Sequence, residues 1–135
     1  MSTATPSEII LHKKSATLEL VYEQKRYELS AEFLRVHSPS AEVKGHGPGQ
    51  EVLQFGKQEV KLASIEPVGS YAIKPTFSDG HQTGIFTWTY LQELCESQDK
   101  LWQSYLNRLK AAGKLRQPLP EQTEVITLKT SPTQT

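Results

Sequence analysis

The fold class is decided by one short stretch of sequence, residues 17–29, which reads TLELVYEQKRYEL. Its first half places Leu18, Leu20 and Tyr22 at every second position, which is the spacing of a strand with one buried face. Residues 23–25 then look like a tight turn, and the last four residues return antiparallel to the first strand. The stretch therefore predicts a β-hairpin.

More strands are predicted on both sides of this hairpin. Apolar and β-branched runs indicate strands at residues 9–12, 57–65, 70–77 and 82–86. The last two are expected to be joined by a tight hairpin turn at Asp79-Gly80, because this dipeptide tolerates a positive φ.

Three helices are expected as well. Ser30 is a suitable N-cap for a short helix over residues 31–36. Near the C-terminus, Thr87 or Thr89 can cap one amphipathic helix, and a second one runs over residues 101–109 to a stop at Gly113. Together these elements predict an α+β fold: a small, mostly antiparallel β-sheet with two C-terminal helices packed on it.

The chain is expected to form one domain, residues 9–113, in which the C-terminal helices extend the sheet region. Residues 1–8 are predicted to be a flexible arm and residues 114–135 a mostly disordered tail. Residues 38–51 hold three of the eight glycines and two of the eight prolines, so we expect an extended loop there. Loops of this length tend either to bind something or to be mobile.

Composition narrows the classes of function. The 15 basic and 15 acidic residues cancel, which argues against nucleic acid or an anionic membrane as the main partner. The single cysteine, Cys95, excludes a disulfide framework and favours a reducing compartment. No targeting segment and no apolar run of about 18 residues is visible, so we expect a cytoplasmic protein.

No common catalytic or nucleotide-binding motif occurs, and we therefore expect that the chain is not an enzyme and needs no cofactor. His37, His46 and His81 flank the two loops expected at one end of the sheet, with Asp79 in support. If the chain brought these side chains together, they would suit zinc or iron. The alternative is that His81 shapes a turn and the other two are solvated.

Aromatic residues gather around the Asp-Gly turn, and most should belong to the core. Trp88 and Tyr90, if exposed beside the glycine-rich loop, would form a contact patch for another protein. Trp102 and Tyr105 could form the seam of a weak homodimer, although core packing is the simpler explanation. We expect a monomer or a weak homodimer.

Three blocks of sequence, residues 34–46, 65–73 and 77–91, carry a resemblance to a known family. They resemble the small bacterial proteins that are similar to the N-terminal domain of gamma-butyrobetaine hydroxylase, a domain of unknown function. The resemblance covers about residues 9–96. It is specific for the family, and much less so for a biochemical activity.

In the full-length hydroxylases this domain precedes an iron and 2-oxoglutarate oxygenase domain, for which 135 residues leave no room. Its structural zinc is held by three cysteines and one histidine, and the resemblance places these positions on Ser38, Ser40, Val43 and His81. Only the histidine is kept. We therefore expect an empty site, with hydrogen bonds and packing, and Ser38 capping a turn, in place of the metal.

Similar domains are also fused to P-loop carrier ATPases that deliver iron–sulfur clusters. This resemblance implies an adaptor that binds an iron–sulfur carrier or assembly protein. The predicted binding surface consists of Arg35, His37, His46, Asp79, His81, Trp88 and Tyr90. A metal-binding domain that uses His37, His46 and His81 is the alternative.

Overall fold

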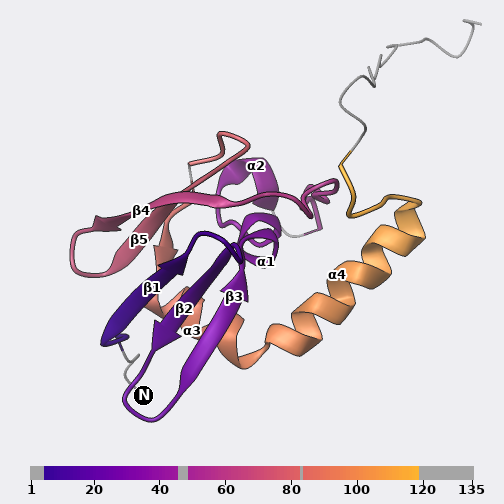
Figure 1. Cartoon of the computed structure of the whole chain (residues 1–135). Helices are drawn as coiled ribbons and strands as arrows, with labels where there is room; N and C mark the ends of the chain where they lie inside the picture. The colour runs from indigo at the N-terminus through magenta and orange to yellow at the C-terminus, as the bar shows by residue number, and fades with distance from the viewer. Residues whose placement is uncertain (1–4, 46–48, 83, 119–135) are drawn as a thin grey trace, which may run out of the picture.

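The computed structural model describes residues 5–45, 49–82 and 84–118 of the chain (Figure 1). Six strands and four helices follow one another along these residues. In chain order they are β1 (Glu8–His12), β2 (Thr17–Val21), β3 (Arg26–Ser30), α1 (Ala31–Val36), α2 (Ala41–Lys44), β4 (Leu62–Val68), β5 (Ala72–Phe77), β6 (Phe86–Thr87), α3 (Trp88–Glu96) and α4 (Gln98–Ala112).

The predicted hairpin is present as β2 and β3, and β1 adds to its other side to give an antiparallel sheet in the order β1-β2-β3. The turn closes with mutual backbone hydrogen bonds between Tyr22 and Lys25, at 2.8 and 3.4 Å. Leu18 pairs with Leu29, and both are fully buried. The alternation therefore marks Leu18 and Leu20 as buried correctly, but the other face of β2 is covered as well, because Glu19 and Val21 are also buried.

The α+β fold class is confirmed, but the strands form two three-stranded sheets rather than one. The second sheet has the order β4-β5-β6, and all its strands are antiparallel. The prediction of a tight hairpin at Asp79-Gly80 is wrong, because β6 is only two residues long and pairs with Ala72 and Ile73 at the far end of β5. A loop over residues 78–85 therefore connects β5 to β6.

The main core lies between the two sheets and helices α1 and α3 (Figure 1). Its largest fully enclosed side chains include Leu20, Phe33, Phe77, Phe86 and Leu91. Cys95 also belongs to this core, and burial raises the pKa of its thiol to about 12. The thiol therefore stays protonated and packs as a small apolar side chain.

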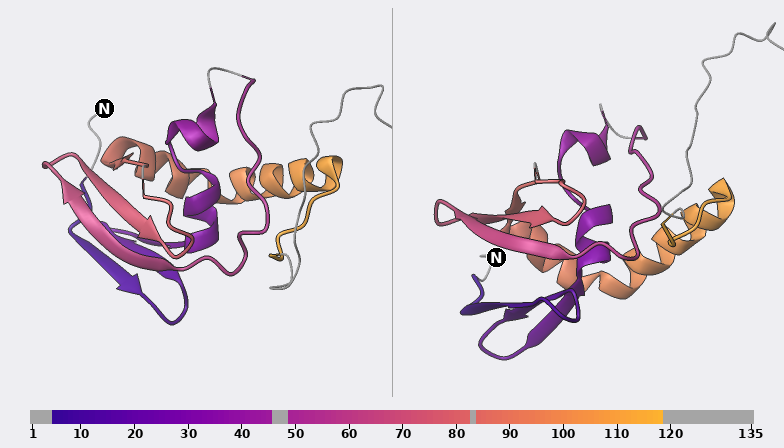
Figure 2. Two further views of the ribbon diagram at one scale, coloured as in Figure 1. Left: turned by 90° about the horizontal axis from the view of Figure 1, so that it is seen from above. Right: turned by 45° about the horizontal axis from the view of Figure 1, so that its top comes forward.

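Helix α4 leaves the sheets and extends to one side of the molecule (Figure 2). A second, smaller core of Val36, Tyr105 and Leu109 joins this helix to α1. Because Tyr105 is only 1% exposed, its ring is used inside the chain and does not offer a dimer seam. The predicted stop is present, since Gly113 adopts a left-handed conformation with φ of 68°.

The structure also modifies the expected chain ends. Ser7 in the expected arm donates its backbone N–H to Val21 O at 2.7 Å, and Glu8 already belongs to β1. In the expected tail, Arg116 forms a two-pronged ion pair with Glu32 at 2.7 and 3.0 Å. Residues 5–8 and 114–118 are thus part of the fold, while 1–4 and 119–135 lie outside the described residues.

Across residues 5–45, 49–82 and 84–118, no helix combines the length and the apolar character needed for a bilayer span.

Candidate functional site

Two segments that are far apart in sequence meet at one end of β5. The first is the connection from α1 to α2, which starts at His37, and the second is the turn at residues 78–81. Helix α1 starts at its N-cap Ser30, whose Oγ accepts from Phe33 N at 3.0 Å, and it ends at His37, where the connection begins. Because α1 is short and well capped, it sets where the connection leaves the core.

The contact between the two segments is a buried cluster of two hydroxyls and one imidazole. His81 Nε2 lies 2.9 Å from Ser38 Oγ and 3.3 Å from Ser40 Oγ. Ser38 is fully buried, and His81 is only 7% exposed. Burial, with the nearby Arg35 charge, lowers the pKa of His81, so the imidazole is neutral near pH 7. Val43, the remaining position of the resemblance, is also buried.

This cluster matches the expectation that hydrogen bonds and packing hold the loop. Ser38 does not cap a turn, however, because its hydroxyl is directed at His81. Gly84 leaves the space that the Ser38 hydroxyl occupies: a Cβ at position 84 would lie only 2.1 Å from Ser38 Oγ. The donor set does not fit a structural zinc ion, since it offers one imidazole, two hydroxyls and an alkyl group.

Ser38, His81 and Glu42 have the residue types of a hydrolytic triad, so their geometry needs testing. Glu42 Oε1 lies 3.9 Å from His81 Nδ1, which is too long for a hydrogen bond. Ser38 has no exposed surface, and a substrate carbonyl cannot reach its oxygen in this structure. The arrangement therefore fixes two segments to each other and presents no accessible nucleophile.

A charged cluster lies beside the imidazole and ties the same two segments together. Arg35 Nε donates to Asp79 Oδ2 at 2.9 Å, and Lys57 Nζ donates to the same oxygen at 2.9 Å. The backbone N–H of His81 donates to Asp79 Oδ1 at 3.1 Å. Burial acts to raise the pKa of Asp79, but these donors outweigh it and hold the pKa at about 2. Arg35 also donates to Gln54 Oε1 at 3.0 Å.

His37 is used differently from His81. Its Nδ1 lies 2.9 Å from the carbonyl oxygen of Phe33, so Nδ1 carries the proton and Nε2 has the lone pair. Nε2 is buried, and no hydrogen-bond partner for it occurs among the described residues. Burial lowers the pKa of His37, the Phe33 hydrogen bond partly offsets this, and the charge of Arg108 lowers it further.

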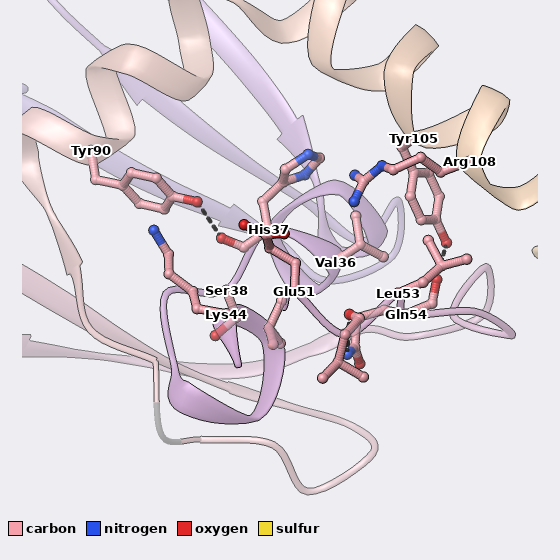
Figure 3. Close-up of a pocket in the computed structure, with 12 residues that line it drawn as sticks. Val36, His37, Ser38, Lys44, Glu51, Leu53, Gln54, Tyr90, Tyr105 and Arg108 are labelled. Atoms are coloured by element: carbon pink, nitrogen blue, oxygen red, sulfur yellow. Dashed lines mark hydrogen bonds between the residues drawn. The ribbon is translucent and has the colours of Figure 1, made fainter. Parts of the chain in front are cut away.

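A pocket of about 200 Å³ opens beside His37 (Figure 3). Its walls come from α1, α2, α3, α4 and the segment that follows residue 48. The lining residues are Val36, His37, Ser38, Val43, Lys44, Glu51, Val52, Leu53, Gln54, Tyr90, Tyr105 and Arg108. Two phenols brace the walls: Tyr90 Oη donates to His37 O at 2.5 Å, and Tyr105 Oη donates to Gln54 O at 2.9 Å.

The structure brings together five of the seven residues in the predicted binding surface: Arg35, His37, Asp79, His81 and Tyr90. Trp88 lies elsewhere, because its Nε1 donates to Ser70 O at 2.8 Å, beside the β4–β5 turn at the opposite end of β5. His46 lies outside the described residues. Arg35 and His81 are buried, so they support the surface from beneath and do not form it.

Sequence reasoning missed Lys44 and Arg108, the two cations that border the pocket. Lys44 lies within the block of residues that carries the resemblance, but a lysine in a glycine-rich loop is not distinctive. Arg108 lies beyond that block, and only the spacing of α4 could have placed it one turn after Ser104 and Tyr105.

The histidines do not form a shared metal site in the described part of the chain. His37 binds a backbone carbonyl and His81 binds two serine hydroxyls. Within residues 5–45, 49–82 and 84–118, no group of three or more His, Cys, Asp or Glu side chains is placed to hold a metal ion.

Comparison with known families identifies the domain. The model of the family described as gamma-butyrobetaine hydroxylase-like, N-terminal, matches residues 9–92, well over half of the chain. The chain belongs to this family. In this gamma-butyrobetaine hydroxylase-like N-terminal domain, the matched range includes both segments that meet at the cluster of two hydroxyls and one imidazole. The range ends before α4.

Solved structures of other proteins extend the likeness of this gamma-butyrobetaine hydroxylase-like domain over nearly the whole chain. One structure determined by NMR in solution is 52% identical, with a TM-score of 0.78, and covers 93% of this chain and 100% of its own. A second NMR structure is 42% identical, with a TM-score of 0.72, and covers 94% and 98%.

A crystal structure from Acidithiobacillus ferrooxidans is also similar, and it is described as a protein of unknown function in the DUF971 family. It is 37% identical, with a TM-score of 0.55, and covers 67% of this chain and 91% of its own. No protein in the curated set matches the chain.

Proposed function

We propose that this chain is a non-enzymatic cytoplasmic binding module, which docks on a protein partner through the pocket beside His37. One contrast carries the proposal. The polar side chains below the pocket are hydrogen-bonded within the chain, whereas side chains at its border are free to contact a partner. Below the pocket, Arg35 donates to Asp79 and Gln54, and both hydroxyls around His81 are used within the chain. At its border, Val52 is 50% exposed and Arg108 makes no ion pair with any described residue.

A rigid base of this kind suits binding better than catalysis. The hydroxyl of Ser38 is buried beside His81, where a substrate cannot reach it. The pKa values of His37 and His81 are both lowered and neither is raised. In contrast, a pocket with fixed walls loses little conformational entropy when a partner binds. The exposed Val52 and Phe55, at 50% and 45%, supply apolar surface next to it.

The class of partner is proposed from the resemblance to domains that are fused to iron–sulfur carrier ATPases. In such fusions the two kinds of domain lie on one chain, which suggests that they work together. We propose that a separate iron–sulfur carrier or assembly protein binds this chain.

The experiment is a titration of the ¹⁵N-labelled chain with a purified P-loop iron–sulfur carrier ATPase, followed by NMR. Amide signals of Lys44, Val52 and Arg108 are expected to shift or broaden, while those of residues 23–25, in the distant hairpin turn, stay unchanged. The proposal is wrong if saturating carrier leaves the pocket amides unchanged and a cluster scaffold protein, tested next, does the same.

A further inference from the structure

We infer that the pocket beside His37 receives a carboxylate side chain from an acidic and partly apolar segment of the partner protein. This inference rests on the proposed function and names the chemistry that the partner presents. Its basis is the pair of cations at the border, the buried lone pair at the base, and the apolar segment along one side.

The two border cations are free to bind an anion, unlike the other cations nearby. Arg35 and Lys57 are both committed to Asp79, and Arg116 is committed to Glu32. Arg108 has no carboxylate partner among the described residues, and Lys44 only lies over the ring of Tyr90, 5.0 Å from its centroid. A guanidinium with free donors favours carboxylate or phosphate oxygens.

The imidazole of His37 at the base of the pocket can take up a proton when an anion binds. His37 Nε2 is an acceptor in the free protein, because Nδ1 is committed to Phe33 O. The charged and titratable groups that surround it are Lys44 of α2, Glu51 of the following segment, Tyr90 of α3, and Tyr105 and Arg108 of α4. Because Nε2 is buried, a carboxylate held at the border would act on it through charge: it would offset the charge of Arg108 and so favour the protonated imidazole.

A protein segment explains the apolar side of the pocket better than a free small acid. Val52 is half exposed, and Leu53 lies next to it along the pocket wall. Phe55, two residues further along the chain, is 45% exposed, and Lys114 Nζ lies 4.8 Å from the centre of its ring. A free carboxylate would leave these side chains in water, whereas a leucine or valine beside the acidic residue would cover them.

Glu51 limits how many acidic groups can bind. Its Oε2 accepts a hydrogen bond from Gly49 N at 3.3 Å, so it stays at the border as a negative charge. With Lys44 and Arg108 it leaves a small net positive charge, enough for one carboxylate. A strongly acidic cluster is therefore disfavoured, and a mixed segment is preferred.

The test uses two blocked hexapeptides, one of alternating leucine and glutamate and one of alternating leucine and glutamine, each titrated into the ¹⁵N-labelled full chain. The glutamate peptide is expected to bind about tenfold more tightly than the glutamine peptide, with shifts at Lys44, Leu53 and Arg108. R108Q should remove most of this preference, while K13Q, at an exposed lysine in the β1–β2 turn, should leave it unchanged.

The role of His37 has its own readout. Binding of the glutamate peptide should strengthen as the pH falls from 8 to 6. H37N, whose amide N–H can take the place of Nδ1–H and keep the hydrogen bond to Phe33 O, should abolish this pH dependence.

Three outcomes would overturn the inference. They are equal binding of the two peptides, an R108Q variant that keeps the preference, or pocket shifts on dilution of the chain alone, which would make a second copy the occupant. If the carrier ATPase binds at the pocket but the glutamate peptide does not, the proposed function stands and this inference fails. If the glutamate peptide binds at the pocket but the carrier ATPase does not, the proposed function fails and this inference stands.

Discussion

Ser38 Oγ is enclosed between His81 and Gly84, so each of these residues limits what the others can be. A Cβ at residue 84 would overlap the hydroxyl, and it would also lie 3.2 Å from Pro39 Cδ. The imidazole in turn depends on the hydroxyls for its hydrogen bonds, since no partner for its other nitrogen occurs in the described residues. Small changes here should therefore be strongly coupled.

The first prediction is a double-mutant cycle at this contact. G84A should lower the free energy of unfolding by about 2 kcal/mol, because the new methyl displaces the Ser38 hydroxyl. S38A alone should cost about 1 kcal/mol through the lost hydrogen bond. In the S38A background G84A should cost distinctly less, as measured by urea unfolding, with S104A in α4 as the exposed control. Strict additivity would contradict the contact.

The second prediction restores thiolates around His81. Because Ser38 Oγ and Ser40 Oγ already lie 2.9 and 3.3 Å from Nε2, the variant S38C/S40C/V43C should bind zinc, at about one ion per chain. Zinc content after dialysis and a rise in melting temperature with added zinc measure this. A variant in which His81 is also replaced by alanine is the control, and equal zinc retention by both would contradict the prediction.

At this scale the sequence identified the cluster only through the resemblance, which placed Ser38, Ser40 and His81 together. No local pattern shows that Asp79 pairs with Arg35, because the two residues are 44 positions apart and the pair depends on where β5 ends. The lone pair of His37 could not be predicted either, since it depends on a backbone carbonyl in the same turn.

Helices α1 and α3 have the same construction at their first residues. Ser30 Oγ accepts from Phe33 N at 3.0 Å, and Thr87 Oγ1 accepts from Tyr90 N at 3.1 Å. Ser30 was predicted as a cap, and Thr87 was one of two candidates beside Thr89, because hydroxyl residues before an apolar run are a direct signal. In contrast, α2 is only four residues long and has no side-chain cap bond, so its segment was predicted as loop.

The third prediction concerns these caps. T87A should lower the free energy of unfolding by about 1 kcal/mol, because Tyr90 N loses its partner at the start of α3. Since Tyr90 also binds His37 O, the same variant should shift the amide signals of the pocket. Chemical denaturation and an NMR spectrum measure both effects, and T76V in β5 serves as the control. If T87A kept the wild-type free energy of unfolding but changed the pocket signals, the effect of Thr87 on the pocket would be separate from its effect on helix stability.

Over the whole molecule, the strands expected at residues 9–12, 17–29 and 70–77 lie close to their predicted bounds. The strand expected from residue 57 begins only at Leu62, and the one expected at 82–86 is present only as the two residues of β6. The division into two sheets was not predicted. Periodicity marks which face of a strand is buried and carries no information on which strands pair. The division depends on where the core lies: Leu18 and Leu29 of one sheet and Phe77 and Phe86 of the other enter the same cluster. Such a packing arrangement involves contacts between distant segments.

The fourth prediction is the stability of the whole fold against pH. The pKa values of His37 and His81 are lowered below the ordinary 6.5, so the unfolded chain binds these protons first. Stability is therefore full above about pH 6.5 and decreases as the pH falls further. A second loss is expected as the pH falls below about 4 towards the Asp79 pKa of about 2.

Melting temperatures across pH 2–8 measure both losses. H37Q should reduce the first loss and leave the second, and D79N should remove much of the second. A wild-type melting temperature that stays level from pH 7 to pH 5 would contradict the burial of the two imidazoles.

The ion pair of Arg116 with Glu32 has a consequence for anything attached to the chain's C-terminal side. Glu32 lies in α1 and is only 5% exposed, so its ion pair fixes Arg116 against the interior of the fold. The guanidinium of Arg116 also lies 5.0 Å from the centre of the Trp102 ring. Two residues later, Pro118 Cα is 3.6 Å from where a Gly56 Cβ would be, close to the wall that Gln54 forms. A group attached beyond residue 118 would thus begin near Gly56, two residues along the chain from the Gln54 wall of the pocket beside His37, and a short linker would give that group a high local concentration there.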